Sequence, residues 1–100
     1  MSNTSYSLKA VIQERHRQEM LWGEQNHDPF LYLTILIEEV GEFAQAALDT
    51  KFGGKESGRM REEAVQMAAV ALAIVECLDR GKWVDPTAKQ GLDVPTPETK

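Results

Sequence analysis

Three glutamates with helical spacing lie within an otherwise apolar segment, Glu38-Glu39-Val40-Gly41-Glu42. Positions three and four apart share one face of a helix, so Glu42 faces the same way as Glu38 and Glu39, and like charges placed in this way repel. Several carboxylates beside an apolar stripe form the oxygen-rich kind of site that Mg²⁺ and Mn²⁺ prefer. A bound divalent cation is the simplest compensation for the repulsion. Gly41 costs about 1 kcal/mol in a helix interior relative to alanine, which predicts that a neighbouring helix or a ligand packs closely against the backbone there.

A second polar patch, Glu62, Glu63 and Gln66, precedes the most apolar run of the chain. Antiparallel packing of the two helices would bring this patch against the first one. Glutamates are also good helix formers, and an exposed, solvated surface is the simpler interpretation for Glu62 because Arg59 and Arg61 lie close by in the sequence. The glutamates of the first patch are flanked by large apolar residues, which favours a binding site there.

The two patches together resemble a known motif. Glu39-x-x-Glu42, a gap of 20 residues and then Glu63-x-x-Gln66 is similar to the two-part metal motif of the all-α nucleoside triphosphate pyrophosphohydrolase superfamily, which includes MazG, the dimeric dUTPases and the dCTP pyrophosphatases. The chain most resembles the small MazG-like proteins of phages and mobile cassettes, over roughly residues 13–83. The superfamily motif ends in Asp, so Gln66 replaces a charged ligand with a neutral amide that could still coordinate through its carbonyl oxygen or through water.

The resemblance implies hydrolysis of a nucleoside triphosphate between its α and β phosphates, giving a monophosphate and pyrophosphate. It implies Mg²⁺ as the cofactor, with Mn²⁺ as a possible substitute, held by Glu39, Glu42, Glu63 and Gln66. Metal ions in such enzymes neutralise and orient the triphosphate and lower the pKa of a bound water. Glu38 and Glu39 are the expected catalytic residues, with Glu38 acting either as a ligand or as the base that positions water.

Residues just before the glutamate-bearing helix could bind the nucleobase. Trp22 offers a stacking surface, and Asn26 and His27, with Gln25 beside them, offer hydrogen-bonding groups. Ordinary packing at a helix end explains Trp22 equally well. Lys51 and Lys55, with Arg59 and Arg61, flank a Gly-Gly loop and could contact phosphates of this subunit or an adjoining one, although a solvated loop is the simpler interpretation.

Hydrophobic periodicity and punctuation predict three helices. The first covers residues 8–22, with Leu8, Val11, Ile12 and Met20 as its apolar face. The second covers residues 29–50, with Asp28 as N-cap and Pro29 in the first turn. The third covers residues 59–80, with Ser57 able to cap its start and Gly81 ending it.

The expected architecture is therefore all-α, a helical bundle of three main helices per chain completed by oligomerisation. The third helix is apolar on nearly every side, so it needs burial all round, and two other helices cannot easily surround it. A homodimer or homotetramer is expected. Residues 1–83 are expected to form the MazG-like helical domain, and residues 84–100, rich in polar residues and proline, a mobile tail.

Composition limits the partners. The formal charge of −5 argues against binding a nucleic acid polymer, while a cation held by carboxylates still permits a nucleotide substrate. The longest apolar run is too short to span a membrane, and a single cysteine, Cys77, fits the core of a cytoplasmic protein. An alternative is a non-catalytic helical module that binds metal, nucleotide or a partner protein. An acidic patch that binds a partner protein would leave Glu39 and Glu42 exposed instead of facing Glu63.

Overall fold

The computed structural model describes residues 2–83, which form three helices and no strand. Helix α1 spans Ser2–Trp22, α2 spans Pro29–Phe52 and α3 spans Met60–Arg80. The prediction of an all-α chain with three main helices is confirmed, with α1 beginning six residues earlier than its apolar pattern indicated. The expected mobile tail, residues 84–100, lies outside the described residues.

Most of the predicted helix boundaries are confirmed. Asp28 caps α2, because its side chain accepts hydrogen bonds from the backbone N–H groups of Phe30 and Leu31, and Pro29 occupies the first turn. Gly81 ends α3 in the left-handed region at φ 68°, which glycine adopts without steric cost. The predicted cap at Ser57 is wrong: Arg59 occupies the N-cap position and makes no side-chain capping bond.

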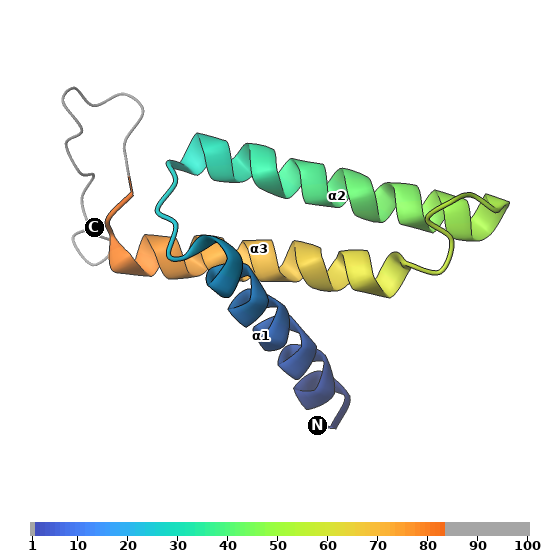
Figure 1. Ribbon diagram of the computed structural model, residues 1–100, viewed down its shortest axis with the longest axis horizontal. Helices are drawn as coiled ribbons and strands as arrows, with labels where there is room; N and C mark the ends of the chain where they lie inside the picture. Colours follow the sequence, from blue (N-terminus) through green and yellow to red (C-terminus); the bar gives the residue numbers. More distant parts are fainter. Residues whose placement is uncertain (1, 84–100) are drawn as a thin grey trace.

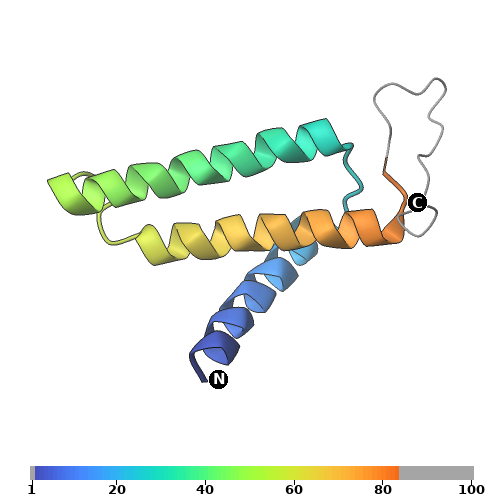
Figure 2. The ribbon, with the colours of Figure 1, turned by 180° about the vertical axis from the view of Figure 1, so that it is seen from behind.

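Helix α3 packs against both of the other helices. Helices α2 and α3 form an antiparallel hairpin, and α1 packs across α3 at an angle (Figure 1). Seen from behind, the C-terminal end of α1 lies against α3 while its N-terminal part projects away from the hairpin (Figure 2). The antiparallel arrangement of α2 and α3 is what the two glutamate patches require in order to meet.

Within residues 2–83 the buried apolar core is small. Tyr32, Ala46, Ala69, Val70 and Cys77 are its buried members, and Cys77 thus lies in the core as expected. A Cβ atom built on Gly41 would have no atom within 4 Å apart from the backbone of its own helix and its chain neighbours. The expectation of close packing there is therefore not met by this chain alone.

Helix α1 packs against α3 mainly through polar residues, and of the four apolar residues expected to form its packing face only Val11 is half-buried. Leu8, Ile12 and Met20 are exposed, whereas Arg15 points toward α3 and its guanidinium lies 2.6 Å from the carboxylate of Glu76. Because α1 has few apolar residues, one partly buried ion pair that forms only when the partner helix is present can orient it.

Large apolar side chains remain exposed on both helices of the hairpin. On α2 the exposed residues Leu33, Ile37 and Val40 follow helical spacing, and on α3 Val75 and Leu78 do the same. Among the described residues, no helix is both long and apolar enough to cross a membrane.

Candidate metal centre and adjoining pocket

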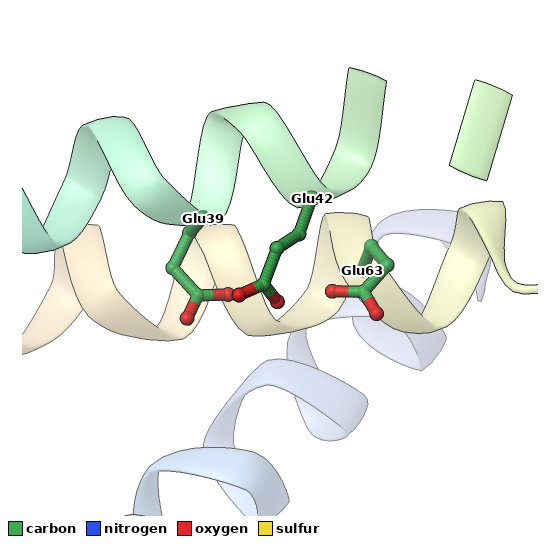
Figure 3. Close-up of side chains that lie close together, drawn as sticks. All are labelled: Glu39, Glu42 and Glu63. Atoms are coloured by element: carbon green, nitrogen blue, oxygen red, sulfur yellow. The ribbon is translucent and has the colours of Figure 1, made fainter. Parts of the chain in front are cut away.

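Three carboxylates converge between α2 and α3. Glu39 and Glu42 reach down from α2, and Glu63 comes from the first turn of α3 (Figure 3). One carboxylate oxygen from each of the three lies within 4.8 Å of the other two. The structure therefore brings together three of the four predicted ligands in an arrangement compact enough for one cation.

Two oxygens of this cluster are buried without a hydrogen-bond partner. These are Oε1 of Glu39 and Oε1 of Glu63, and Glu63 as a whole is only 4% exposed. A buried charged oxygen without a partner is costly. Protons or a cation between the carboxylates would offset this cost.

Burial and the neighbouring carboxylates raise the pKa of Glu39 and of Glu63. For Glu39 the main cause is desolvation by burial, followed by the nearby charges of Glu42 and Glu63. For Glu63 burial again leads, followed by Glu42, and the Arg59 guanidinium opposes the rise in pKa. Burial and like-charge repulsion both favour the neutral form of a carboxyl.

One basic residue touches the cluster. Arg59 lies 3.4 Å from Glu63 but also pairs with Glu56 at 3.2 Å and with Glu62 at 2.7 Å. Its single charge is shared among three carboxylates, so it offsets only part of the negative charge at Glu63. The Glu62 side chain is half exposed and bonded to Arg59, which matches the solvated role expected for it.

Gln66 and Glu38 occupy different environments. Gln66 lines a hollow together with Glu42 and Glu63, and it lines a second pocket together with Glu39. Gln66 therefore lies beside the carboxylate cluster without being one of its three members. Glu38 is exposed and belongs neither to the carboxylate cluster nor to the pocket lining.

A pocket of about 220 Å³ lies at the junction of all three helices and meets the cluster at Glu39. Glu39 and Gln66 lie at one end of its lining, and Trp22, Gly23 and Gln25 come from the connection between α1 and α2. The pocket thus joins a carboxylate site to an aromatic surface, since Trp22 is 59% exposed.

The other predicted substrate residues lie outside this pocket lining. The Asn26 amide is bonded on both sides, with its oxygen accepting from Arg80 and its nitrogen donating to Glu24. His27 packs edge-on against the Tyr32 ring, with ring centroids 5.0 Å apart. Both residues are therefore held by the protein itself.

Lys51 and Lys55 are exposed, in the last turn of α2 and in the connection that follows it. The connection between α2 and α3 is at the end of the hairpin opposite the connection between α1 and α2 (Figure 1). Lys51 lies 5.4 Å from the Phe52 ring centre. Neither lysine lines the pocket, and a phosphate contact from an adjoining subunit stays a prediction.

The sequence analysis missed the contribution of α1. Glu14, Arg17 and Gln18 line the pocket, and Arg17 donates two hydrogen bonds to Glu14 at 2.9 and 2.7 Å. These bonds, opposed by desolvation, lower the pKa of Glu14. A usable signal was present, because Glu14 and Gln18 share the helical face of Val11 and so point toward the hairpin.

Comparison of the chain with protein families, with characterised proteins and with solved structures found no match. The resemblance to the pyrophosphohydrolases therefore depends on the motif residues themselves, and functional inference depends on the site described above.

Proposed function

We propose that this chain is a Mg²⁺-dependent nucleoside triphosphate pyrophosphohydrolase of the MazG-like type, cleaving between the α and β phosphates. The observation that carries the proposal is the cluster of Glu39, Glu42 and Glu63, whose carboxylate oxygens gather within 4.8 Å at one end of a pocket that has Trp22 at its lining. A triphosphate that binds with its phosphates at the cluster would place its base toward the aromatic end.

The residues present fit a hard divalent cation. Glu39 and Glu63 each have a buried oxygen without a partner, all three donors are carboxylates, and Gln66 lines the pockets beside them. Glu39, Glu42 and Glu63 would hold Mg²⁺, with Mn²⁺ as a substitute, and Gln66 would be the weaker ligand. When bound, the cation supplies charge neutralisation for the phosphates and a water of lowered pKa.

The side chains around the cluster have separate roles in this proposal. Glu39 lines the pocket and is the carboxylate best placed to orient a water against the substrate. Glu38 is exposed and outside the cluster, so the proposal depends on Glu39 for this task, and a Glu38 variant separates the two assignments.

Oligomerisation and location belong to the same proposal. The exposed apolar rows on α2 and α3 exceed what isolated surface residues explain, and such surfaces usually mark association sites. We propose that a homodimer or homotetramer covers them, in the cytoplasm, and that the substrate is a nucleoside triphosphate and not a nucleic acid polymer.

A non-catalytic metal-binding or nucleotide-binding module is the second candidate. The replacement of an acidic ligand by Gln66 favours it, because a neutral amide binds a hard cation more weakly than a carboxylate. A purely protein-binding acidic patch agrees with the exposure of Glu42. It is less well supported by Glu39, which is half-buried, and by the way both carboxylates face Glu63.

The test is pyrophosphate release from the common and damaged ribo- and deoxyribonucleoside triphosphates, with Mg²⁺ or with EDTA. We expect release only with the metal, and a loss of about 10²–10³-fold in kcat for Glu39→Gln and for Glu63→Gln, the size typical of removing one electrostatic contribution from a reaction site.

Glu62→Gln is the matched control, because it removes a neighbouring carboxylate that lies outside the cluster. Release without metal, or full activity of both cluster variants, would reject the mechanism. Metal-dependent nucleotide binding without release would support the non-catalytic module.

A further inference from the structure

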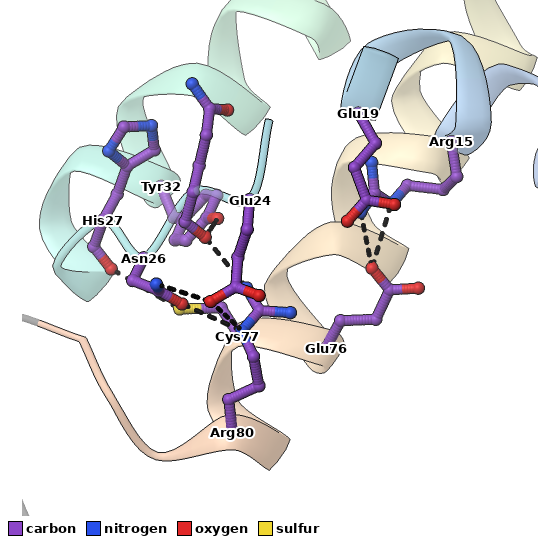
Figure 4. Close-up of polar contacts among 10 residues, drawn as sticks. Arg15, Glu19, Glu24, Asn26, His27, Tyr32, Glu76, Cys77 and Arg80 are labelled. Atoms are coloured by element: carbon purple, nitrogen blue, oxygen red, sulfur yellow. Dashed lines mark hydrogen bonds and ion pairs between the residues drawn. The ribbon is translucent and has the colours of Figure 1, made fainter. Parts of the chain in front are cut away.

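The connection between α1 and α2, residues 23–28, is anchored at one backbone carbonyl by two side chains from different helices. Arg80 donates to the carbonyl oxygen of Gln25 at 2.9 Å, and the Tyr32 hydroxyl donates to the same oxygen at 2.8 Å. Figure 4 shows Arg80 reaching from the end of α3 toward this connection. A carbonyl oxygen has two lone pairs, so both donors can be satisfied together.

The same guanidinium contacts the residues on both sides of Gln25. Arg80 Nε donates to Asn26 Oδ1 at 2.9 Å and lies 3.4 Å from the Glu24 carboxylate. Asn26 Nδ2 donates in turn to Glu24 at 3.0 Å. One side chain thus holds three consecutive residues of the connection, which has no regular structure of its own.

The two anchors are themselves rigidly placed. Tyr32 is 5% exposed, and burial raises the pKa of its hydroxyl to about 12, so it remains a donor throughout the neutral range. Arg80 occupies the last turn of α3, just before the left-handed Gly81. Because α3 also carries Glu63, the anchor and the carboxylate cluster belong to the same rigid helix.

The anchored connection forms one end of the pocket. Gly23 and Gln25 line it together with Trp22, and Tyr32 and Arg80 line it as well. The carbonyl of Gln25 is fixed by the anchors, whereas no hydrogen bond of the described residues engages its side-chain amide. The connection therefore presents a free amide from a fixed backbone.

We propose that Arg80, with Tyr32, is a positioning residue that holds residues 23–28 in the conformation that binds the nucleoside part of the substrate. This inference rests on the proposed function and extends it by naming what sets substrate affinity. The reacting phosphates lie at the Glu39 end of the pocket, so loss of the anchor acts on binding of substrate more than on its chemistry.

Affinity falls in proportion to the fraction of molecules that hold the binding conformation. If Arg80→Met leaves about one molecule in ten with the connection in place, KM rises about tenfold, while kcat at saturating substrate changes by less than about threefold. Tyr32→Phe raises KM by a smaller factor because the charged donor remains. Arg80→Lys, which keeps the charge and one donor, recovers part of the affinity.

The double variant Arg80→Met with Tyr32→Phe distinguishes the shared anchor from two independent effects. Both donors bind one oxygen, so their effects on KM should not multiply. Lys82→Met is the matched control: it removes a positive charge two residues away that makes none of these hydrogen bonds, and its KM should equal that of the wild type.

Binding without turnover is measured separately with a panel of α,β-methylene nucleoside triphosphates, followed by tryptophan fluorescence in Mg²⁺, and amide hydrogen exchange reports the mobility of residues 23–28. Weaker binding and faster exchange in Arg80→Met, with Mg²⁺ binding unchanged by calorimetry, are the expected results. An unchanged KM, or a fall in kcat at constant KM, would overturn the inference.

The outcomes for the two proposals are separable. If the wild type binds the analogues but releases no pyrophosphate, the proposed hydrolase activity fails while the role of Arg80 in binding stands. If the wild type is active and Arg80→Met binds and turns over substrate normally, only the positioning role fails. If the wild type neither binds the analogues nor releases pyrophosphate, both are overturned.

Discussion

Glu63→Gln should change the thermal stability of this protein in opposite directions with and without a divalent cation. Glu63 is almost fully buried, one of its oxygens has no hydrogen-bond partner, and burial together with the Glu42 charge raises its pKa. The substitution keeps the shape of the side chain and removes its charge. It therefore relieves repulsion in the metal-free protein and removes a ligand from the metal-bound one.

The magnitudes follow from these contacts. The glutamine amide is neutral and its NH2 group can donate to a neighbouring carboxylate, so the substitution removes the cost of an unpaired buried charge, about 1–3 kcal/mol. It also removes the partly exposed ion pair with Arg59, which returns less than about 1 kcal/mol. Glu63→Gln should thus stabilise the metal-free protein by about 1–2 kcal/mol. For a domain of this size about 1 kcal/mol shifts Tm by about 4–8 °C.

The metal adds a second, opposite effect. A cation present at about 100 times its Kd stabilises the folded state by about 2.7 kcal/mol, which corresponds to a rise in Tm of about 10–20 °C. The wild type should show this rise on addition of Mg²⁺, and Glu63→Gln should lose most of it.

Differential scanning calorimetry in EDTA and in a Mg²⁺ series, at one fixed protein concentration, measures both effects. Glu62→Gln, which lies beside Glu63 but outside the cluster, should respond to Mg²⁺ as the wild type does. A wild type whose Tm does not change with Mg²⁺ or Mn²⁺, or a Glu63→Gln variant that retains the full rise, would refute the reasoning about this cluster.

Three further predictions concern other parts of the chain. The folded-state pKa values of Glu39 and Glu63 are raised, so the metal-free protein should gain stability relative to Glu63→Gln as pH falls through those raised values. Saturating Mg²⁺ should abolish this gain, and chemical denaturation at several pH values measures it. Asp28→Ala removes the α2 cap and should lower stability by about 1 kcal/mol, seen as a fall in Tm, whereas a Tm equal to that of the wild type would count against the cap. Ile37→Asp places a charge in the exposed apolar row of α2 and should shift the protein to a smaller species in size-exclusion chromatography with light scattering; an unchanged mass would show that this row is not an interface.

Local features of the sequence determined the helices. Asp28-Pro29 and Gly81 act within a few residues of themselves, through side-chain capping and through the conformational freedom of glycine, so their consequences could be read without knowledge of the fold. The i, i+3 spacing of Glu39 and Glu42 likewise places both carboxylates on one face of α2 whatever packs against it. Their meeting with Glu63 needed one added assumption, antiparallel packing of the second and third helices, and that assumption is confirmed.

Long-range contacts decided the remainder of the site. The partners of Arg15 and Arg80 lie more than fifty residues away in sequence, and an arginine has no local signature that tells which carboxylate or carbonyl it will meet. The placement of α1 across α3, and with it Glu14 and Arg17 in the pocket, follows from such pairings because the apolar residues of α1 are too few and too scattered to orient the helix. The sequence by itself thus determined the helices and the acidic face of α2, through interactions within one turn. The pocket beside that face exists only because tertiary packing brings distant polar groups into contact.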